Sequence, residues 1–505
     1  KFRDSPFATP NRYNWPVFTT LGVSLRDAVG SSQQKTQKKS RGASGIPMYS
    51  LTWEDREFQA AQKNFDTVVQ SLGDVNALLE RCFGQFPYHL PTLLQLRQAF
   101  DIMGDQPNSQ LMLDMALYTI GVVLGRFPLA SSVLDRQFPS HLHGNRVVLE
   151  TLHLGVIQAL KRGCNRTAFQ LSRLLLSMDA KDPFAVLLYT DYLALRSRQW
   201  ETLLEVFACC DAAWSSKHRL EEEEGDVEED EGDRSPSCTL AQLIVSLPGF
   251  HFNAALAKFL LEGAEEEASV AAATSSMGKQ QRTCTTSNSL KGASCEFPSQ
   301  RQGLPESRVM LARALVQFPH AAILLAEKIG LDEDVRGRPE WQYLLSLSLQ
   351  TEDRLKESGF GSDAMAHVAS LFVARSHDLW KTRDALNFFS KGLSRLGPLC
   401  GTAGAATVSS QEGDAVEYSC LLSGSACLEL RMRRDTFAAE TLLRRYRRTT
   451  VDDVLGETVA RIAPELLNPA AQPDELQRDA RRMEIDALME QGYPQTELDA
   501  LSRFE

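Results

Sequence analysis

The residues best suited to binding another molecule are arginines near the end of the 505-residue chain. They are Arg431, Arg434, Arg444, Arg445, Arg447 and Arg448. A guanidinium group donates paired hydrogen bonds to phosphate or carboxylate, so these side chains are candidate contacts for RNA or for an acidic protein. A solvated helix surface that pairs with an acidic loop of the same chain is the alternative. Between Arg444 and Arg448, Tyr446 is the only aromatic residue, which disfavours sequence-specific reading of single-stranded RNA.

Residue patterns that perform catalysis are absent from the sequence. It contains no phosphate-binding P-loop, no strand-linked dinucleotide fingerprint, no nucleophile elbow and no HExxH zinc motif. Its carboxylate pairs lack the apolar surroundings that would raise a pKa for acid–base work. Cys209 and Cys210 follow an amphipathic segment, and we expect them to pack rather than act as nucleophiles. The sequence therefore predicts a non-catalytic protein without a cofactor.

Metal binding is also not expected. His141 and His143 form an HxH pair, but His153 and Cys164 are the only further candidates nearby. Exposed loop histidines are the simpler interpretation, since a structural zinc site needs four well-spaced ligands. The ten cysteines contain no CxxC pair, which is typical of reduced thiols in a cytosolic or nuclear protein.

Composition sets limits on the class of protein. The chain has a net charge of −11 and 43% hydrophobic residues, so it can build a core but does not favour nucleic-acid binding over its whole surface. No run reaches the roughly 18 apolar residues of a membrane span, so no membrane segment is predicted. The first residues, from Lys1, do not resemble a signal peptide. The length favours two or more domains or an extended solenoid.

Helical periodicity dominates from Thr52 onward, where Thr52 and Asp55 indicate a helix start. Because proline has no amide hydrogen and disfavours helix at the preceding residue, Phe–Pro and Asp–Pro pairs predict helix ends. These pairs occur at Phe86–Pro87, Phe127–Pro128, Asp182–Pro183 and Phe318–Pro319. No sustained two-residue alternation indicates strands. The predicted fold class is all-α.

The clearest unit of this pattern spans Arg166 to Phe207, as three short helices with Pro183 at the first position of the second. Small residues opposite large ones are typical of stacked helix pairs. The prolines do not recur at the spacing of about 34 residues found in tetratricopeptide repeats. We therefore predict a degenerate tetratricopeptide-like helical-repeat array with disordered loop inserts.

The predicted domain organisation has five parts, with inserts where the composition turns acidic or rich in small residues. The parts are an irregular N-terminal segment (1–51), a helical-repeat domain (52–395, inserts near 214–240, 263–305 and 330–362), a linker (396–418), a basic C-terminal helical region (419–468) and a polar tail (469–505).

Several segments together resemble the transcription factor 25 family. The most similar stretch is Asp191–Arg198 (DYLALRSR), preceded by Lys161–Ala168, Leu175–Met178 and Asp182–Pro183. Further segments follow the family in order: Pro87–His89 with Leu93–Leu96, Leu247–Phe250 with Phe252 and Phe259–Leu261, Ala314–Leu315 with Phe318–Pro319, and Arg375–Lys381. After Lys381 the match is loose.

The resemblance implies a non-catalytic adaptor of the ribosome-associated quality control complex on stalled 60S subunits. Its implied partners are the large ribosomal subunit, a listerin-type ubiquitin ligase, ubiquitin, an AAA-type unfoldase and the nascent-chain tailing factor. For the arginine cluster, ribosomal RNA and an acidic protein both remain candidate partners on the chemistry of arginine alone. The implied location is the cytoplasm, with the nucleus as a second site. The alternative is a nuclear transcriptional repressor that acts through protein contacts, since no DNA-reading motif is present.

Overall fold

A computed structural model describes residues 7–8, 15–16, 24–27, 49–53, 56–70, 75–125, 138–140, 143–211, 236–276, 306–357, 363–397 and 443–450. The described residues fall into two compact units, an N-terminal unit up to Phe184 and a C-terminal unit from Ala185 onward. The sequence predicts a single repeat domain over 52–395, and the division lies inside it. The prediction of an all-α chain is confirmed for the described residues apart from one short strand pair.

The N-terminal unit consists of β1 (Ser24–Asp27), β2 (Tyr49–Thr52), α1 (Arg56–Gln70), α2 (Val75–Ala77), the π-helix η1 (Leu78–Phe83), α3 (Leu90–Ile102), α4 (Gln106–Gly125), α5 (His143–Lys161) and α6 (Asn165–Met178). Its later helices pack on their neighbours in sequence: α3 on α4, α4 on α5 and α5 on α6. The two strands are antiparallel, with Ser24 opposite Thr52.

The start of α5 holds strand β2 in place. Asn145 Oδ1 accepts a hydrogen bond from the Leu51 amide at 3.0 Å, and its Nδ2 donates to the Tyr49 carbonyl at 2.7 Å. Trp53 Nε1 donates to the Gly144 carbonyl at 3.0 Å. A Cβ at Gly144 would overlap the Leu51 carbonyl, so the close approach of strand and helix requires glycine.

The strand pair corrects two predictions. The segment 1–51 is not irregular throughout, because Ser24–Asp27 and Tyr49–Leu51 lie in strands. Thr52 ends β2 and does not begin a helix; α1 begins at Arg56. Strands of four residues are too short to show a clear alternation, which is why the sequence pattern missed them.

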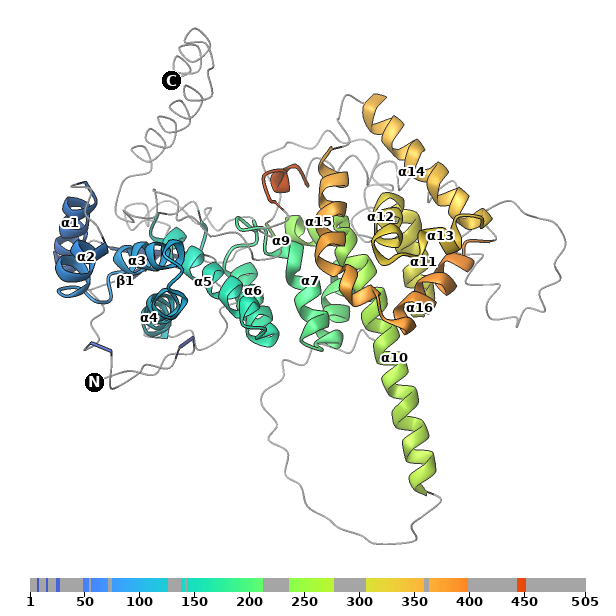
Figure 1. The fold of residues 1–505 in the computed structure, drawn as a ribbon, viewed down its shortest axis with the longest axis horizontal. Coiled ribbons are helices and arrows are strands. Elements are labelled where there is room, and N and C mark those ends of the chain that lie inside the picture. Colours follow the sequence, from blue (N-terminus) through green and yellow to red (C-terminus); the bar gives the residue numbers. More distant parts are fainter. Residues whose placement is uncertain are drawn as a thin grey trace, which may run out of the picture. The chain divides into compact units, whose positions relative to one another are not determined.

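The C-terminal unit consists of α7 (Leu187–Arg196), a helix over residues 200–211, α9 (Pro236–Ser246), α10 (Pro248–Ser276), α11 (Ser307–Gln317), α12 (Pro319–Ile329), α13 (Asp332–Val335), α14 (Pro339–Glu357), α15 (Asp363–Trp380), α16 (Arg383–Ser394) and the 3-10 helix η5 (Arg444–Tyr446). Here packing is not confined to sequence neighbours. Helix α15 contacts α7, α10 and α12, and α16 contacts α11 (Figure 1).

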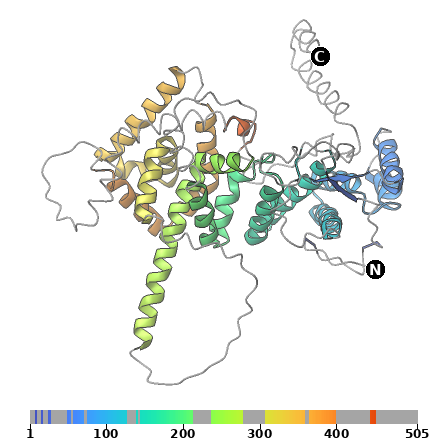
Figure 2. The same cartoon turned by 180° about the vertical axis from the view of Figure 1, so that it is seen from behind.

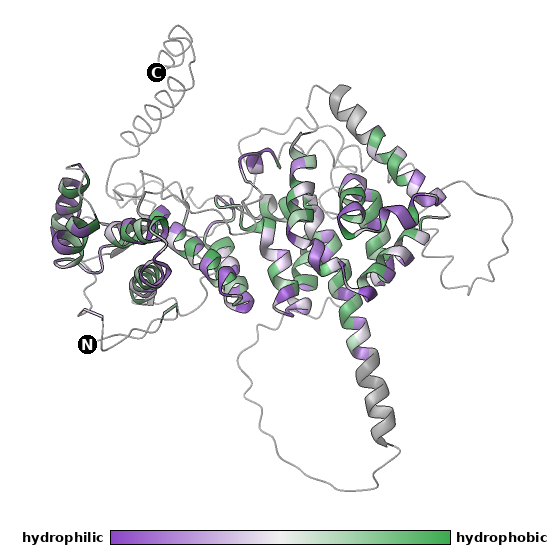
Figure 3. Ribbon diagram, viewed as in Figure 1, coloured by the Kyte–Doolittle hydropathy of each residue, from purple (hydrophilic) through white to green (hydrophobic). Residues whose placement is uncertain are grey.

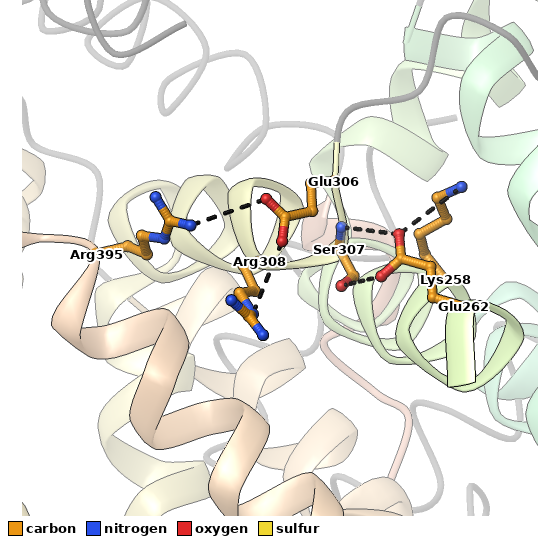
Figure 4. A network of polar contacts seen from close by, with 6 residues as sticks. All are labelled: Lys258, Glu262, Glu306, Ser307, Arg308 and Arg395. Atoms are coloured by element: carbon orange, nitrogen blue, oxygen red, sulfur yellow. Dashed lines mark hydrogen bonds and ion pairs between the residues drawn. The ribbon is translucent and has the colours of Figure 1, made fainter. Parts of the chain in front are cut away.

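A carboxylate of α10 holds the start of α11. Glu262 accepts hydrogen bonds from Ser307, at 2.6 Å from its hydroxyl and 3.3 Å from its amide (Figure 4). Lys258, one turn earlier on α10, lies 3.8 Å from the same carboxylate. The negative charge of Glu262 satisfies an amide that the helix itself leaves unpaired. Beyond this contact, α10 extends away from the other helices of the unit in both views (Figures 1 and 2).

The prediction that Phe–Pro and Asp–Pro pairs mark helix ends is confirmed at three described positions. Helix α11 ends at Gln317 and α12 begins at Pro319, while Pro87 follows η1 and Pro183 follows α6. Pro183 does not open the next helix, however. Helix α7 begins at Leu187, because the intervening turn places Asp182 and Ala185 at positive φ. Residues 127–128 lie outside the described residues.

Three predicted inserts are wrong in part. The insert near 214–240 overlaps α9, which begins at Pro236. Residues 263–276 continue α10, since their alanines and glutamates favour helix. The insert near 330–362 is largely helical as α13 and α14, with Trp341 and Leu344 buried. The tetratricopeptide-like repeat is not confirmed, and the unit singled out for it, Arg166 to Phe207, crosses the division between the two compact units.

Among the described residues, no single helix has the length and apolarity to span a membrane. Two bent helix pairs, Leu240–Ser246 with Pro248–Glu265 and Ser307–Gln317 with Pro319–Ile329, meet that test by length and composition alone.

Candidate functional site

A buried polar network joins three helices of the C-terminal unit. Asn253 of α10 donates from Nδ2 to Asp191 of α7 at 2.7 Å and to the Ser376 hydroxyl of α15 at 3.2 Å. Trp380 Nε1, also on α15, donates to Asn253 Oδ1 at 3.4 Å. Asp191 is 3% exposed and Asn253 is fully buried. One amide side chain thus satisfies buried groups on two other helices, which fixes α15 against α7 and α10.

Two neighbours complete this network. Gly249 lies so close to Asp191 that an added Cβ would overlap its carboxylate. The guanidinium of Arg375 lies 4.6 Å from the Tyr192 ring centre and 5.6 Å from that of Tyr189. The aromatic faces attract the buried cation, which compensates part of its lost hydration. Helix α7 therefore presents both a carboxylate and two aromatic rings to α15.

Burial governs the charge state of this network. It raises the pKa of Asp191 to about 6, although the Asn253 hydrogen bond and the Arg375 charge favour the carboxylate. Burial also lowers the pKa of Arg375. Proton transfer to a ligand would require access from solvent, and both side chains are buried. The arrangement serves packing and orientation.

A buried histidine connects a fourth motif to the same core. His251 of α10 donates from Nε2 to the Val245 carbonyl at 2.8 Å. Its ring centre lies 5.0 Å from that of Phe318, at the junction of α11 and α12. Burial lowers the pKa of His251, so the neutral ring is favoured. Four of the segments that resemble the family therefore meet in one core. They are the segments that contain Asp191, Phe250, Phe318 and Ser376.

The fifth motif, in the N-terminal unit, is also buried. His89 hydrogen-bonds to Thr92 at 2.9 Å and to Gln62 at 3.2 Å, and burial lowers its pKa to about 3. Tyr88 donates to the Pro16 carbonyl at 2.7 Å. These polar side chains are satisfied within the core and are not available to a ligand.

The segment of residues 443–450 packs against α15 and carries exposed side chains (Figure 1). Leu443 and Tyr446 are 0% and 1% exposed, and His367 of α15 donates from Nε2 to the Thr449 carbonyl at 2.7 Å. Arg444, Arg445, Arg447 and Arg448 are all exposed. The segment is accordingly among the hydrophilic parts of this unit in Figure 3.

Four of the six predicted partner-binding arginines are thus brought together on one short segment. Arg431 and Arg434 lie outside the described residues. The sequence predicts an α-helix here, but η5 is a 3-10 helix and the chain continues in turns, with Arg447 N donating to Arg444 O at 3.1 Å. The sequence analysis did not predict that Leu443 and Tyr446 are buried. Their spacing of three residues, which places them on one side of a 3-10 helix, could have indicated it.

The other candidate residues form no site among the described residues. His141 lies outside them, while the His153 ring stacks on Phe184 with 5.1 Å between centres. Cys164 and Cys209 are exposed, and burial raises the pKa of Cys210 to about 12, so that thiol stays protonated. No cluster of three or more histidine, cysteine or acidic residues capable of holding a metal occurs in the described ranges.

The sequence matches one protein family, described as "Transcriptional repressor TCF25", over residues 49–446. It is 26% identical over 384 residues to the mouse (Mus musculus) "Ribosome quality control complex subunit TCF25", covering 74% of this chain and 43% of that protein. It is 29% identical over 192 residues to the Schizosaccharomyces pombe "Ribosome quality control complex subunit 1", covering 38% of this chain and 27% of that protein.

A third relative carries a different name. The "Probable transcription factor claV" of Ampulloclitocybe clavipes is 28% identical over 382 residues, covering 74% of this chain and 41% of that protein. The chain thus spans less than half the length of these relatives. No solved structure matches the chain.

Proposed function

This chain belongs to the transcription factor 25 family, and from that premise we propose that it is an adaptor of ribosome-associated quality control. The observation that carries the proposal is the family match over residues 49–446, which extends across both compact units. Relatives from mouse and fission yeast are named as subunits of a ribosome quality control complex. The adaptor acts on stalled 60S subunits and assists the ubiquitination and extraction of nascent chains.

The proposed adaptor performs no chemistry itself. The polar residues of the family motifs, Asp191, Asn253 and His89 among them, are buried and satisfied by neighbouring side chains. Buried groups of this kind orient helices and do not meet a substrate. In the proposal, the protein positions a listerin-type ubiquitin ligase, ubiquitin, an AAA-type unfoldase and the nascent-chain tailing factor, and favours the chain linkage that signals degradation. Its location is the cytoplasm, with the nucleus as a second site.

A repeat-like architecture is part of this proposal for the N-terminal unit. There α3 packs on α4, α4 on α5 and α5 on α6, the neighbour-to-neighbour contact expected of stacked helices. The C-terminal unit supports it less, since α15 packs on α7 and α12 across a long stretch of chain. Stacked helices offer extended surfaces for several partners at once.

Fractionation of cells that express the tagged chain tests the adaptor role. After translation is stalled, we expect the chain to move into the fractions that contain free 60S subunits and to co-purify with the ubiquitin ligase. Cells without stalling serve as the control, with a smaller 60S-associated fraction. If the chain stays in ribosome-free fractions after stalling, the proposal fails.

A nuclear transcriptional repressor is the second candidate. It is favoured by the family's description and by the name of the fungal relative. Chromatin immunoprecipitation of the tagged chain, run beside the fractionation, separates the two roles. Enrichment on chromatin without association with 60S subunits would favour the repressor.

A further inference from the structure

We propose that Arg444, Arg445, Arg447 and Arg448 form an arginine platform that binds the phosphate backbone of structured RNA. The identification of that RNA with the large ribosomal subunit rests on the proposed function. The contact with RNA phosphates rests on the geometry of residues 443–450.

The 3-10 geometry sorts this segment into three rows. Beyond η5, the amides of Arg447 and Thr449 donate to the carbonyls of Arg444 and Tyr446, three residues earlier, at 3.1 and 3.0 Å. Residues three apart lie above one another in this geometry, so Leu443, Tyr446 and Thr449 fall on one side. Of these, Leu443 and Tyr446 are buried and Thr449 is half-buried. Arg444 with Arg447, and Arg445 with Arg448, form the two outward rows, and all four are exposed. The row that contains Leu443 and Tyr446 packs on the protein, and the two arginine rows are exposed.

The platform is held in place before any partner binds. Leu443 and Tyr446 pack against the folded unit beside α15, and the hydrogen bond from His367 to Thr449 closes its end at 2.7 Å. Helix α15 is itself fixed by the buried network around Asn253. A segment already ordered loses less conformational entropy on binding than a free basic tail does, which strengthens the contact.

The burial of Tyr446 indicates which part of RNA is recognised. With 1% of its surface exposed, this ring cannot stack on a base. The exposed residues of the segment include the four arginines. Guanidinium groups pair with phosphate oxygens irrespective of sequence. In ideal 3-10 geometry the backbone positions within each row repeat at about 6 Å along the axis. Four clustered cations can therefore meet a rigid and regularly charged RNA backbone. An acidic peptide would have to become ordered before it could satisfy all four.

The test uses the full chain and a fluorescently labelled RNA duplex of about 20 base pairs, with affinity measured by anisotropy across a series of salt concentrations. The test variant changes Arg444, Arg445, Arg447 and Arg448 to Glu. The matched control changes Lys63, Arg166, Arg383 and Lys391 to Glu, four exposed cations elsewhere, and lowers the net charge equally. A third variant changes the four platform arginines to Lys.

We expect the glutamate platform variant to lose about 100-fold in affinity near 0.1 M salt, with a salt slope smaller by about 3 to 4. The charge-matched control should change affinity by less than about 3-fold, because its cations are dispersed. The lysine variant should keep most of the salt slope, since it keeps the phosphate-facing charge. All variants should unfold within about 2 °C of the wild type, because the altered side chains are exposed.

Three outcomes would overturn the proposal: equal RNA binding by the platform variant and its control, no RNA binding by the wild type, or binding of a decaglutamate peptide in place of RNA. Failure of the adaptor role looks different. A wild type that binds the duplex but stays out of the 60S fractions after stalling would keep the platform and remove the ribosomal assignment. Association with 60S subunits without duplex binding would keep the adaptor role and remove the arginine platform.

Discussion

Gly249 and Asp191 show how closely α10 and α7 approach one another. The carboxylate of Asp191 occupies the space that any side chain at Gly249 would need, and it also accepts the 2.7 Å hydrogen bond from Asn253. A change at either residue therefore acts on the position of α15 through Asn253 and Ser376. The family motifs that contain these residues are explained by packing.

Gly249→Ala is expected to lower the free energy of unfolding by about 1 to 3 kcal/mol, because the new methyl group forces Asp191 away from Asn253. Gly263→Ala, on the same helix but in open space, is the matched control. It should leave stability unchanged or raise it by about 0.5 to 1 kcal/mol, since alanine favours helix. Chemical denaturation of the two variants measures both effects. Equal effects of the two substitutions would contradict the close approach at Gly249.

Asp191 should also give stability a characteristic pH dependence. Its folded pKa of about 6 lies above the ordinary value of 3.8, so the folded state binds the proton more tightly than the unfolded state. The sign is that stability is greatest at low pH and falls as the pH rises from about 4 through 6. Between pH 5 and pH 7.5 the loss amounts to about 1 kcal/mol.

Asp191→Asn removes the titrating proton and keeps the shape of the side chain. The difference in unfolding free energy between wild type and variant should therefore shift in favour of the variant as the pH rises from 5 to 7.5. Parallel denaturation series at the two pH values measure that shift. A difference that stays constant, or moves the other way, would show that Asp191 is ionised in the folded state throughout this range.

At this scale the sequence shows which segments resemble the family, but not which residues those segments contact. The motif Asp191–Arg198 was identifiable from its letters, yet its contact with Asn253 joins residues 62 positions apart. No local pattern carries such a pairing. The exposure of Arg444 and Arg448 was predictable from charge, because burial of unpaired guanidinium groups is costly.

At the scale of elements, the segment 443–450 depends on α15 for its conformation. The 3-10 helix η5 has only three residues and is too short to be stable alone. The segment is held by the buried side chains of Leu443 and Tyr446 and by the hydrogen bond from His367 to the Thr449 carbonyl. Removing one buried side chain should release the segment without changing its charge.

Tyr446→Ala is expected to speed tryptic cleavage at Arg444, Arg445, Arg447 and Arg448 by about 10-fold or more, because a protease needs a locally unfolded chain. Leu349→Ala, which removes an exposed side chain of α14, serves as the control and should not change the rate. Timed digestion followed by mass spectrometry gives the cleavage rates. Unchanged cleavage in Tyr446→Ala would mean that the segment is not held by its aromatic anchor.

Elements with strong local signals were predictable, and those that depend on tertiary contacts were not. Phe318–Pro319 marked the break between α11 and α12 because proline acts through its own covalent geometry. Helix α14 was mistaken for an insert, since its apolar face is completed only by packing against α11, α12 and α16. Strand β2 is too short to show an alternation, and the Asn145 side chain that binds it lies 94 residues further along the chain.

At the scale of the whole molecule, the two compact units carry different kinds of feature. The N-terminal unit has neighbour-to-neighbour helix packing, and the C-terminal unit carries the buried motif core together with the arginine platform. The net charge of −11 makes the platform an exception on an acidic chain. Its contact with RNA should therefore be local and sensitive to salt.

The most direct measurement is co-sedimentation of the purified chain with purified 60S subunits at about 0.1 M salt. The wild type and the charge-matched control should pellet with the subunits, and the platform variant with four Arg→Glu changes should stay largely in the supernatant. Raising the salt to about 0.5 M should release the wild type as well. A wild type that never pellets with 60S subunits would contradict the adaptor role, and a platform variant that pellets as fully as the wild type would contradict the arginine contact.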